Sequence, residues 1–339
     1  MQVFEGLSAN EVWQEAANVL QSQRQGRQSS RGGDTYEIIP ACFVIKDPRQ
    51  RWVISREPAL SVAFALVELV GIINGRRDSA YLNYFNPVLS RYAGKGATFY
   101  GAYGHRLRQN FHVDQVKRAA EVLASAPDSR QVVLQIWDAQ LDLPASDGKA
   151  RSDDIPCNVC SMLKVRDRRL HWTQVMRSND LFRGSPYNFV QFTTLQEVVS
   201  GWLNLDVGEY THLSDSLHIY VRDAEKTFAY SKQPTPPNTD SLALPYEESQ
   251  RCWSVLNECV DELAKPRTPR EIESIAAVRD MPVAYLNVLR IIAADAARRI
   301  GDLDLARELG RKCNNAMLTL CWERWYARRY RRATRPTSL

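Results

Sequence analysis

The fold is decided by residues 155–203, which read IPCNVCSMLKVRDRRLHWTQVMRSNDLFRGSPYNFVQFTTLQEVVSGWL. Apolar and polar residues alternate on both sides of the charged turn Arg166–Arg168, and this alternation predicts an antiparallel hairpin. Beyond the hairpin, large apolar residues recur at helical spacing, at Phe189, Phe192, Leu195, Val199 and Trp202. Two strands followed by a long helix indicate an α/β protein.

The chain on either side of this stretch continues the mixture of strands and helices. Ser8 and Glu11 form a capping box that opens a helix ending near Gln23. Residues 58–74 are apolar almost without interruption except for Glu68, which predicts a buried helix that carries one carboxylate. We further expect a helix over 113–125, strands over 36–45, 130–138 and 208–223, and a mobile loop over the polar, glycine-rich residues 25–35.

The composition changes after residue 230. Residues 231–248 read SKQPTPPNTDSLALPYEE, and their prolines and small polar residues predict a linker. The chain beyond the linker has a helical pattern, with Thr268, Pro269 and Glu271 combining an N-cap, a first-turn proline and a capping box. The sequence therefore predicts one unit over 1–230, a linker over 231–248, and a helical C-terminal extension over 249–339.

The bulk composition is that of a soluble globular enzyme. The chain has 339 residues, of which 44% are hydrophobic and 24% charged. It contains no run that approaches the roughly 18 apolar residues of a membrane span, and its first residues do not resemble a secretion signal, so a cytoplasmic protein without membrane contact is expected. Seven cysteines without disulfide-framework spacing fit reduced thiols, one of which is available as a nucleophile.

The net charge of +5 comes from the end of the chain, where six arginines cluster at positions 324, 328, 329, 331, 332 and 335. Two interpretations of this Arg-rich end stay open. Trp325, Tyr326 and Tyr330 alternate with the arginines, as in segments that bind nucleic acid by stacking and charge neutralisation, and such contact would tether the enzyme near a replication complex. More commonly, such a run is a solvated helix face that packs its aromatic residues on its own domain.

The residues that bear chemistry are concentrated between Ile155 and Tyr220. A cysteine follows a proline at Pro156-Cys157, an Arg-Ser pair stands at 177–178, an asparagine lies near a helix start at 188, and a His-x-Tyr ends the stretch. Cys157 and Cys160 have the spacing of half a zinc site, but the chain offers no second pair of ligands at matching spacing, so no metal is expected. Taken singly, either cysteine could be a buried structural residue.

Together, these motifs resemble the thymidylate synthase family, which includes hydroxymethylases of pyrimidine nucleotides. The resemblance rests on Pro156-Cys157, on RSNDLFRGSPYNF at 177–189 and on HIY at 218–220. Upstream, VELVGIINGRRDSAYL resembles the family's glutamate-bearing helix, YGHRLR its YG-x-x-x-R turn and PDSRQVVLQIWD its PDSRR strand. The resemblance spans roughly residues 8–222 and implies a large mixed sheet with flanking helices, a homodimer formed through that sheet, and 5,10-methylenetetrahydrofolate as cosubstrate.

The resemblance also implies roles for residues at the reacting ring. Cys157 would attack C6 of the pyrimidine, because a thiolate is soft and nucleophilic enough to add to an electron-poor carbon. Glu68 would shuttle protons at O4 and N3 through water, assisted by Tyr103 near C5. Asn188 would pair with N3–H and O4 of uracil, and Asp180 would bind the folate pterin. Since family members that act on cytosine nucleotides can carry Asp at the position of Asn188, dUMP is the expected substrate.

The remaining roles implied by the resemblance concern phosphate and sugar. Guanidinium groups suit a dianionic phosphate, so Arg31, Arg177 and Ser178 are expected to hold the 5′-phosphate, with Arg130 contributed by the second subunit. His218 and Tyr220 match the family's residues for the sugar 3′-hydroxyl. A pyrimidine nucleoside monophosphate and a folate are thus the implied small-molecule partners.

The sequence departs from a synthase in ways that bear on the product. Asn158 stands where synthases usually have His, Met176 where they have Gln, and Gln131 where they have a second Arg. We also expect no short apolar tail of the kind that excludes water from the synthase site. If the site stays wet, water rather than hydride captures the methylene group and the product is a 5-hydroxymethyl pyrimidine. The alternatives are thymidylate synthase, a dCMP or CMP hydroxymethylase, or a non-catalytic nucleotide- or RNA-binding homologue.

Overall fold

A six-stranded mixed sheet organises the molecule. The computed structural model describes residues 1–22, 27–30, 32–228 and 235–333. The strand order is β1-β4-β9-β7-β6-β5, with bounds β1 Gln2–Gly6, β4 Ala41–Ile45, β5 Val133–Gln135, β6 Asn158–Arg166, β7 Arg169–Met176 and β9 Asp206–Ser214. β1 runs parallel to β4 and β7 parallel to β9, and the other neighbours are antiparallel. The expected α/β fold with a large mixed sheet is confirmed.

The predicted hairpin forms the centre of this sheet. Asp167 and Arg168 have φ of 49° and 58°, the left-handed conformation that two-residue hairpin turns require. Inward and outward residues alternate along β7, which buries Trp172, Gln174 and Met176 on the core side. The register shifts between Asn158 and Cys160, so a bulge lies directly after the expected nucleophile.

A smaller, four-stranded sheet corrects two expectations. Its order is β2-β3-β10-β8, with β2 Arg27–Ser30, β3 Gly33–Ile38, β8 Asn179–Asp180 and β10 Leu217–Tyr220. The loop expected over 25–35 is wrong for its described residues, because most of them form the β2/β3 hairpin. The single strand expected over 208–223 is divided between β9 in the large sheet and β10 in the small one, and its last residues begin helix α9, Val221–Phe228.

Two long helices separate the large sheet from the rest of the protein. α8, Ser185–Trp202, contacts β7 and β9, and α2, Val62–Ile73, contacts α8. Every residue of α2 except Glu68 is buried, as expected from its continuous apolar sequence. The remaining elements before α8 are short or peripheral: α1 Ala9–Ser22, α3 Ala80–Phe85, α4 Ser90–Ala93, α5 Tyr103–His105, a π-helical turn Arg106–Asn110, α6 Gln115–Ser125 and α7 Ala139–Asp142.

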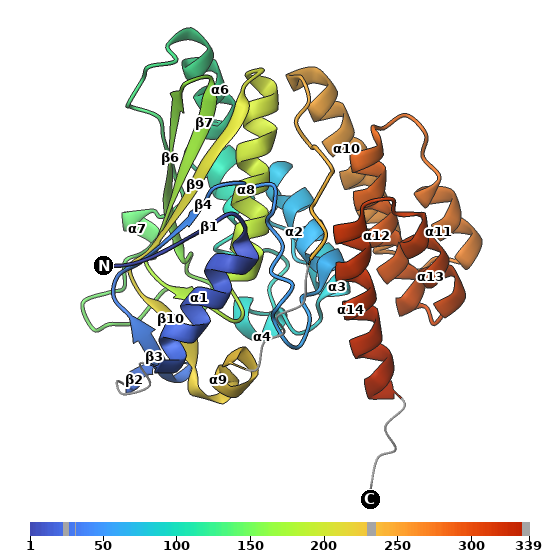
Figure 1. Cartoon of the computed structure of the whole chain (residues 1–339), viewed down its shortest axis with the longest axis horizontal. Helices are drawn as coiled ribbons and strands as arrows, with labels where there is room; N and C mark the ends of the chain where they lie inside the picture. The colour runs from blue at the N-terminus through green and yellow to red at the C-terminus, as the bar shows by residue number, and fades with distance from the viewer. Residues whose placement is uncertain (23–26, 31, 229–234, 334–339) are drawn as a thin grey trace, which may run out of the picture.

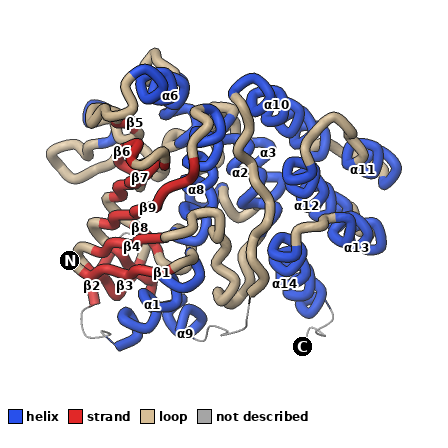
Figure 2. The backbone as a smooth tube through the Cα atoms, turned by 45° about the horizontal axis from the view of Figure 1, so that its top comes forward, coloured by secondary structure: helices blue, strands red, loops and turns tan. Residues whose placement is uncertain are grey.

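After residue 245, the described part of the chain forms five helices, which make up a third layer. They are α10 Tyr246–Leu263, α11 Pro269–Ala276, α12 Val283–Arg299, α13 Leu303–Lys312 and α14 Ala316–Ala333. Figures 1 and 2 show the strands on one side, α2 and α8 in the middle, and these helices on the far side. Helices α10, α12 and α14 all contact α2, and one continuous hydrophobic core includes residues of all three layers. The expected helical extension is confirmed, together with the capping box of Thr268 and Glu271.

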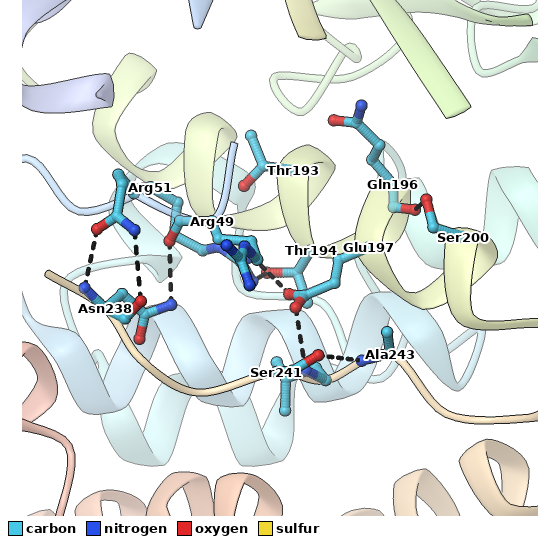
Figure 3. Close-up of polar contacts among 12 residues, drawn as sticks. Arg49, Arg51, Thr193, Thr194, Gln196, Glu197, Ser200, Asn238, Ser241 and Ala243 are labelled. Carbon is cyan, nitrogen blue, oxygen red and sulfur yellow. Dashed lines mark hydrogen bonds and ion pairs between the residues drawn. The ribbon is translucent and has the colours of Figure 1, made fainter. Parts of the chain in front are cut away.

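An extended segment, residues 235–245, ties the third layer to α8 (Figure 3). Arg51 donates to Glu197 of α8 at 2.5 Å and to Thr194 at 2.6 Å, and both members of this ion pair are buried. The second oxygen of Glu197 accepts from the backbone N–H of Leu242 at 3.1 Å. A buried ion pair therefore connects the strand-bearing part of the chain with the segment leading to the helices.

The Arg-rich end packs on the rest of the chain as far as its side chains are described. Arg324 pairs with Glu57, and Arg328 donates to the carbonyl of Ala59 at 2.9 Å. Trp322 and Trp325 are buried beside them. These contacts agree with a helix that packs its aromatic residues on its own protein, and Arg335 lies outside the described residues. Within the described ranges, no helix is long and apolar enough to cross a membrane.

Candidate active site

The Cys157 loop is held from two sides. Arg177 donates its backbone N–H to the carbonyl of Cys157 at 3.0 Å, and its guanidinium donates to the carbonyls of Pro156 at 2.9 Å and Ile155 at 3.2 Å. On the other side, the backbone N–H of Gly101 donates to the Asp154 carboxylate at 2.8 Å. A Cβ atom at Gly101 would lie 2.5 Å from the Asp154 carbonyl oxygen, so only glycine permits this close approach. These contacts hold the backbone that carries the half-buried thiol.

Tyr103 lies beside this thiol. Burial raises the pKa of Tyr103 well above its ordinary value, the neighbouring Cys157 raises it further, and the Asn158 amide lowers it. Gly104 allows α5 to approach α2 closely, because a Cβ at this position would lie 2.6 Å from the carbonyl oxygen of Ile72 on α2. The same contact between α5 and α2 places Tyr103 within electrostatic reach of Glu68. The structure therefore brings together the three residues expected to act on the ring, Cys157, Tyr103 and Glu68.

Glu68 is the one carboxylate of a helix otherwise buried. Burial raises the pKa of Glu68 to about 7, and the hydrogen bond from Gln191 partly offsets that rise. Gln191 Nε2 donates to Glu68 Oε2 at 2.6 Å. A carboxyl group with a pKa near 7 can both give and take a proton at neutral pH, which is what acid–base catalysis needs.

Asn158, next to the cysteine, belongs to a buried hydrogen-bond chain. Its Oδ1 accepts from Gln174 Nε2 at 2.8 Å, and Gln174 Oε1 accepts from Ser161 Oγ at 2.6 Å and from Trp172 Nε1 at 3.2 Å. Asn158 and Gln174 are both 0% exposed. The two residues that depart from the synthase pattern near the cysteine, Asn158 and Met176, thus lie in the site, facing each other across β6 and β7.

Asn188 belongs to a second polar chain. Its Nδ2 contacts Met176 Sδ at 3.4 Å and Asn179 Oδ1 at 3.3 Å. Asn179 Nδ2 in turn donates to His212 Nε2 at 2.9 Å and to Ser214 Oγ at 3.1 Å. Burial lowers the pKa of His212 to about 3, so the ring is neutral and Nε2 can accept. With Nδ2 engaged, Asn188 presents Oδ1, which accepts no hydrogen bond from the described residues, as an acceptor.

Asp180, His218 and Tyr220 meet on the small sheet. β8 and β10 run parallel, and this pairing places His218 opposite Asp180. Asp180 Oδ1 accepts from the backbone N–H groups of Phe182 at 2.8 Å and Arg183 at 2.9 Å. Burial raises the pKa of Asp180, and His218 acts in the opposite direction. The rings of His218 and Tyr220 lie 5.5 Å apart, edge to face.

The residues expected to bind phosphate are only partly assembled. Arg177 is at the cysteine loop, where its guanidinium lies 5.2 Å from the centre of the Trp137 ring, and Ser178 follows it. Arg31 lies outside the described residues, although the next residue, Gly32, packs against the Tyr220 hydroxyl and accepts from Arg222 at 2.7 Å. Arg130 is exposed on the turn before β5 and is not joined to the other site residues. Its expected role needs a second subunit.

Three polar residues of the site were not expected from the sequence. Gln191 follows Asn188 by one helical turn, and that spacing on α8 was a usable signal. Gln174 occupies an inward position of β7 between Trp172 and Met176, where an apolar residue is usual. Asn179 stands between the Arg-Ser pair and Asp180 and carries no local signal of its contact with His212.

The site's chemistry is that of a thiol with proton-transfer groups. All seven cysteines lie in the described part of the chain and are reduced. Among the described residues, no group of three or more His, Cys, Asp or Glu side chains could hold a metal ion. A soft nucleophile beside a neutral phenol and a carboxyl of pKa near 7 suits addition to an electron-poor double bond followed by proton transfer.

Comparison with known proteins agrees with this chemistry. The chain is 32% identical over 204 residues to the deoxyuridylate hydroxymethyltransferase of Bacillus phage SP01, an alignment that covers 57% of this chain and 52% of the phage protein. It is 34% identical over 197 residues to the protein of that name from Pseudomonas phage M6, covering 57% and 55%. A Methanothermobacter marburgensis protein named, provisionally, as a thymidylate synthase is 30% identical over 215 residues, covering 62% and 89%.

The chain spans about half the length of the two phage relatives. Residues 17–251 match the family model described as thymidylate synthase. This range includes every described residue of the candidate site. This match covers more than half of the chain. The chain therefore belongs to the thymidylate synthase family.

Proposed function

We propose that the protein transfers a one-carbon unit from 5,10-methylenetetrahydrofolate to C5 of dUMP and releases 5-hydroxymethyl-dUMP. The observation that carries this proposal is the convergence of Cys157, Tyr103 and Glu68, the last with a pKa of about 7. The names of the two phage relatives support hydroxymethylation of deoxyuridylate in particular.

The reaction is balanced as dUMP, methylenetetrahydrofolate and water giving 5-hydroxymethyl-dUMP and tetrahydrofolate. Cys157 adds its sulfur to C6, which makes C5 nucleophilic towards the methylene carbon. Loss of the C5 proton and of the folate nitrogen leaves an exocyclic methylene group. Water adds to that group, and the C6–S bond breaks to release Cys157. Glu68 and Tyr103 would move the protons at O4 and near C5.

The orientation of Asn188 supports uracil as the base. Because Nδ2 is engaged with Met176 and Asn179, Oδ1 is left as an acceptor for a donor on the substrate. Uracil carries a hydrogen on N3, whereas N3 of cytosine is itself an acceptor and would face Oδ1 without a hydrogen bond. We therefore place dUMP ahead of dCMP or CMP.

The remaining site residues would bind the phosphate, the sugar and the folate. Arg177, Ser178 and Arg31 would bind the 5′-phosphate, and His218 and Tyr220 the sugar hydroxyl. Asp180 would bind the folate, since its second carboxylate oxygen makes no hydrogen bond to the described residues while Oδ1 holds the turn before α8.

We further propose a homodimer that forms through the large sheet. One side of β7 is buried against α8, while the side chains on its other face, His171, Thr173 and Val175, remain partly exposed. A second subunit on that face would also supply Arg130. In this arrangement residues 1–230 are the catalytic unit, and the helices after the linker support it through α2.

The deciding experiment is the mass of the product from dUMP and methylenetetrahydrofolate. A product heavier than dUMP by CH₂O supports the proposal, whereas one heavier by CH₂, with dihydrofolate, identifies a thymidylate synthase as the name of the archaeal relative suggests. Trapping with 5-fluoro-dUMP and the folate should give a covalent complex that Cys157→Ser abolishes. Cys160→Ser, three residues along and also half-buried, is the matched control and should still form it. Absence of any complex would favour a non-catalytic binding protein.

A further inference from the structure

The hydrogen-bond chain below Cys157 has a direction that the chemistry of its members determines. The indole Nε1 of Trp172 can only donate, and it points at Gln174 Oε1 at 3.2 Å. Ser161 Oγ donates to the same oxygen at 2.6 Å. Two donors on one atom identify that atom as the amide oxygen. Gln174 therefore has its Nε2 on the side of Asn158.

The donor-to-acceptor order of the chain continues from Gln174 to Asn158, next to Cys157. Gln174 Nε2 donates to Asn158 Oδ1 at 2.8 Å and to the Cys160 carbonyl at 3.2 Å. Asn158 must then turn its Nδ2 away from Gln174. That nitrogen is buried and has no hydrogen-bond partner among the described residues. Burial raises the pKa of the nearby Tyr103 phenol, and the Asn158 side chain acts in the opposite direction, so the interaction of Asn158 with Tyr103 favours negative charge on the phenol oxygen.

We propose that Gln174 is a positioning residue, which fixes the Asn158 amide so that an N–H group faces the Tyr103 oxygen beside Cys157. This inference rests on the proposed function. In the step concerned, the C5–H bond breaks and its electron pair forms the exocyclic double bond as the methylene carbon separates from the folate nitrogen. Tyr103 first passes its own proton to water, and the resulting phenolate then takes up the C5 proton, while the folate nitrogen keeps the C–N electron pair and is protonated. A donor on the phenol oxygen stabilises the charge that develops there.

Two substitutions of equal size should turn an oxygen of residue 158, in place of its N–H group, towards the Tyr103 oxygen. Gln174→Glu replaces the donor to Asn158 by an acceptor, so the Asn158 amide should flip and present its oxygen to Tyr103. Asn158→Asp keeps the bond from Gln174 and likewise presents an oxygen. Removal of one such donor typically costs a hundredfold or more in kcat, so we expect a loss of about 100-fold with either variant and a KM for dUMP within about twofold of the original.

Trapping with 5-fluoro-dUMP separates positioning from structural damage. Fluorine at C5 cannot leave as a proton, so formation of the covalent complex needs Cys157 and the folate but not the step assigned to Tyr103. Both variants should therefore form the complex at close to the original rate. Their turnover per trapped site, which is kcat divided by the number of sites that 5-fluoro-dUMP labels, should fall. Gln174→Met removes the hydrogen bond to Asn158 without introducing a charge. This further variant should also keep the trapping rate and lose turnover, by a smaller factor.

Gln196→Glu is the matched control. Gln196 is also fully buried, and its Nε2 donates to the carbonyls of Leu170, Gly208 and Glu209, away from Cys157. Its substitution should reduce the amount of folded enzyme but leave turnover per trapped site unchanged. Unchanged turnover per site in Gln174→Glu and Asn158→Asp, or equal loss of trapping and turnover, would overturn the inference. Failure of the original enzyme to form any complex would instead overturn the proposed function, and a methylated product would leave the inference intact because both reactions remove the C5 proton.

Discussion

Glu68→Gln should make the protein inactive and, above neutral pH, more stable. The Glu68 carboxyl has a pKa of about 7 in the folded protein against 4.5 ordinarily, because burial penalises the charged form. A group whose pKa is raised on folding binds its proton more tightly in the folded state. The stability associated with Glu68 is therefore complete below about pH 4.5 and falls as the pH rises to about 7.

The size of the effect follows from the shift. At about 1.4 kcal/mol per pKa unit, a rise from 4.5 to about 7 lowers the free energy of unfolding by about 3 kcal/mol at pH 8 relative to pH 4. A glutamine at this position stays neutral and can still accept from Gln191 Nε2. With an unfolding entropy of about 2 cal/mol/K per residue, the 339-residue chain should gain about 4 °C in Tm at pH 8.

The assay is urea unfolding of the original protein and Glu68→Gln at several pH values from 4.5 to 8.5. The difference between the two proteins isolates one titration, since every other group is shared. It should be near zero at the acid end and grow towards about 3 kcal/mol in favour of the glutamine variant. Glu15→Gln, at an exposed carboxyl of α1, is the control and should give a flat difference. A difference for Glu68→Gln that is independent of pH would refute the reasoning.

Three further outcomes are expected. Asn188→Asp should raise the ratio of kcat/KM for dCMP over dUMP by about 100-fold, because a protonated carboxyl donates to N3 of cytosine and accepts from its amino group; an unchanged ratio in competition assays would contradict the role of Asn188. Glu197→Ala leaves Arg51 buried without its partner and should cost about 3–5 kcal/mol in urea unfolding, whereas replacing both residues by Leu and Met should restore most of the loss. Mixing and refolding Arg130→Ala with Cys157→Ala should regain up to about a quarter of the original activity, since about half of the dimers are then mixed and each mixed dimer contains one intact site of two. No recovery above either parent would show that Arg130 acts within its own subunit or not at all.

The sequence predicted the site best where function and local pattern coincide. Glu68 interrupts an otherwise apolar helix and stands out by itself, whereas Cys157 is singled out by the family resemblance of the motifs around it. The helices α2 and α8 were likewise evident from apolar spacing. These features depend on residues within a few turns of each other in the chain.

The features that the sequence did not predict depend on distant partners. Gln191 is 123 residues from Glu68 in the chain, and only the packing of α8 on α2 brings them together. The residues of the β2/β3 hairpin are polar and small, which predicts a loop, but the hairpin is ordered by pairing with β10, far along the chain. Local propensity cannot anticipate a strand whose main stabilising neighbour is so remote.

The burial of α2, complete except for Glu68, has a consequence for biosynthesis. Helices α10, α12 and α14 cover one side of α2, and they are made after α2, α8 and the sheet. At a synthesis rate of about 5–20 residues per second, the ribosome needs on the order of 10 s to add residues 235–333 after α2, α8 and the sheet have left it. During that interval an apolar helix surface remains uncovered. The nascent chain should therefore depend on chaperones during that interval, when all the candidate site residues have already been made.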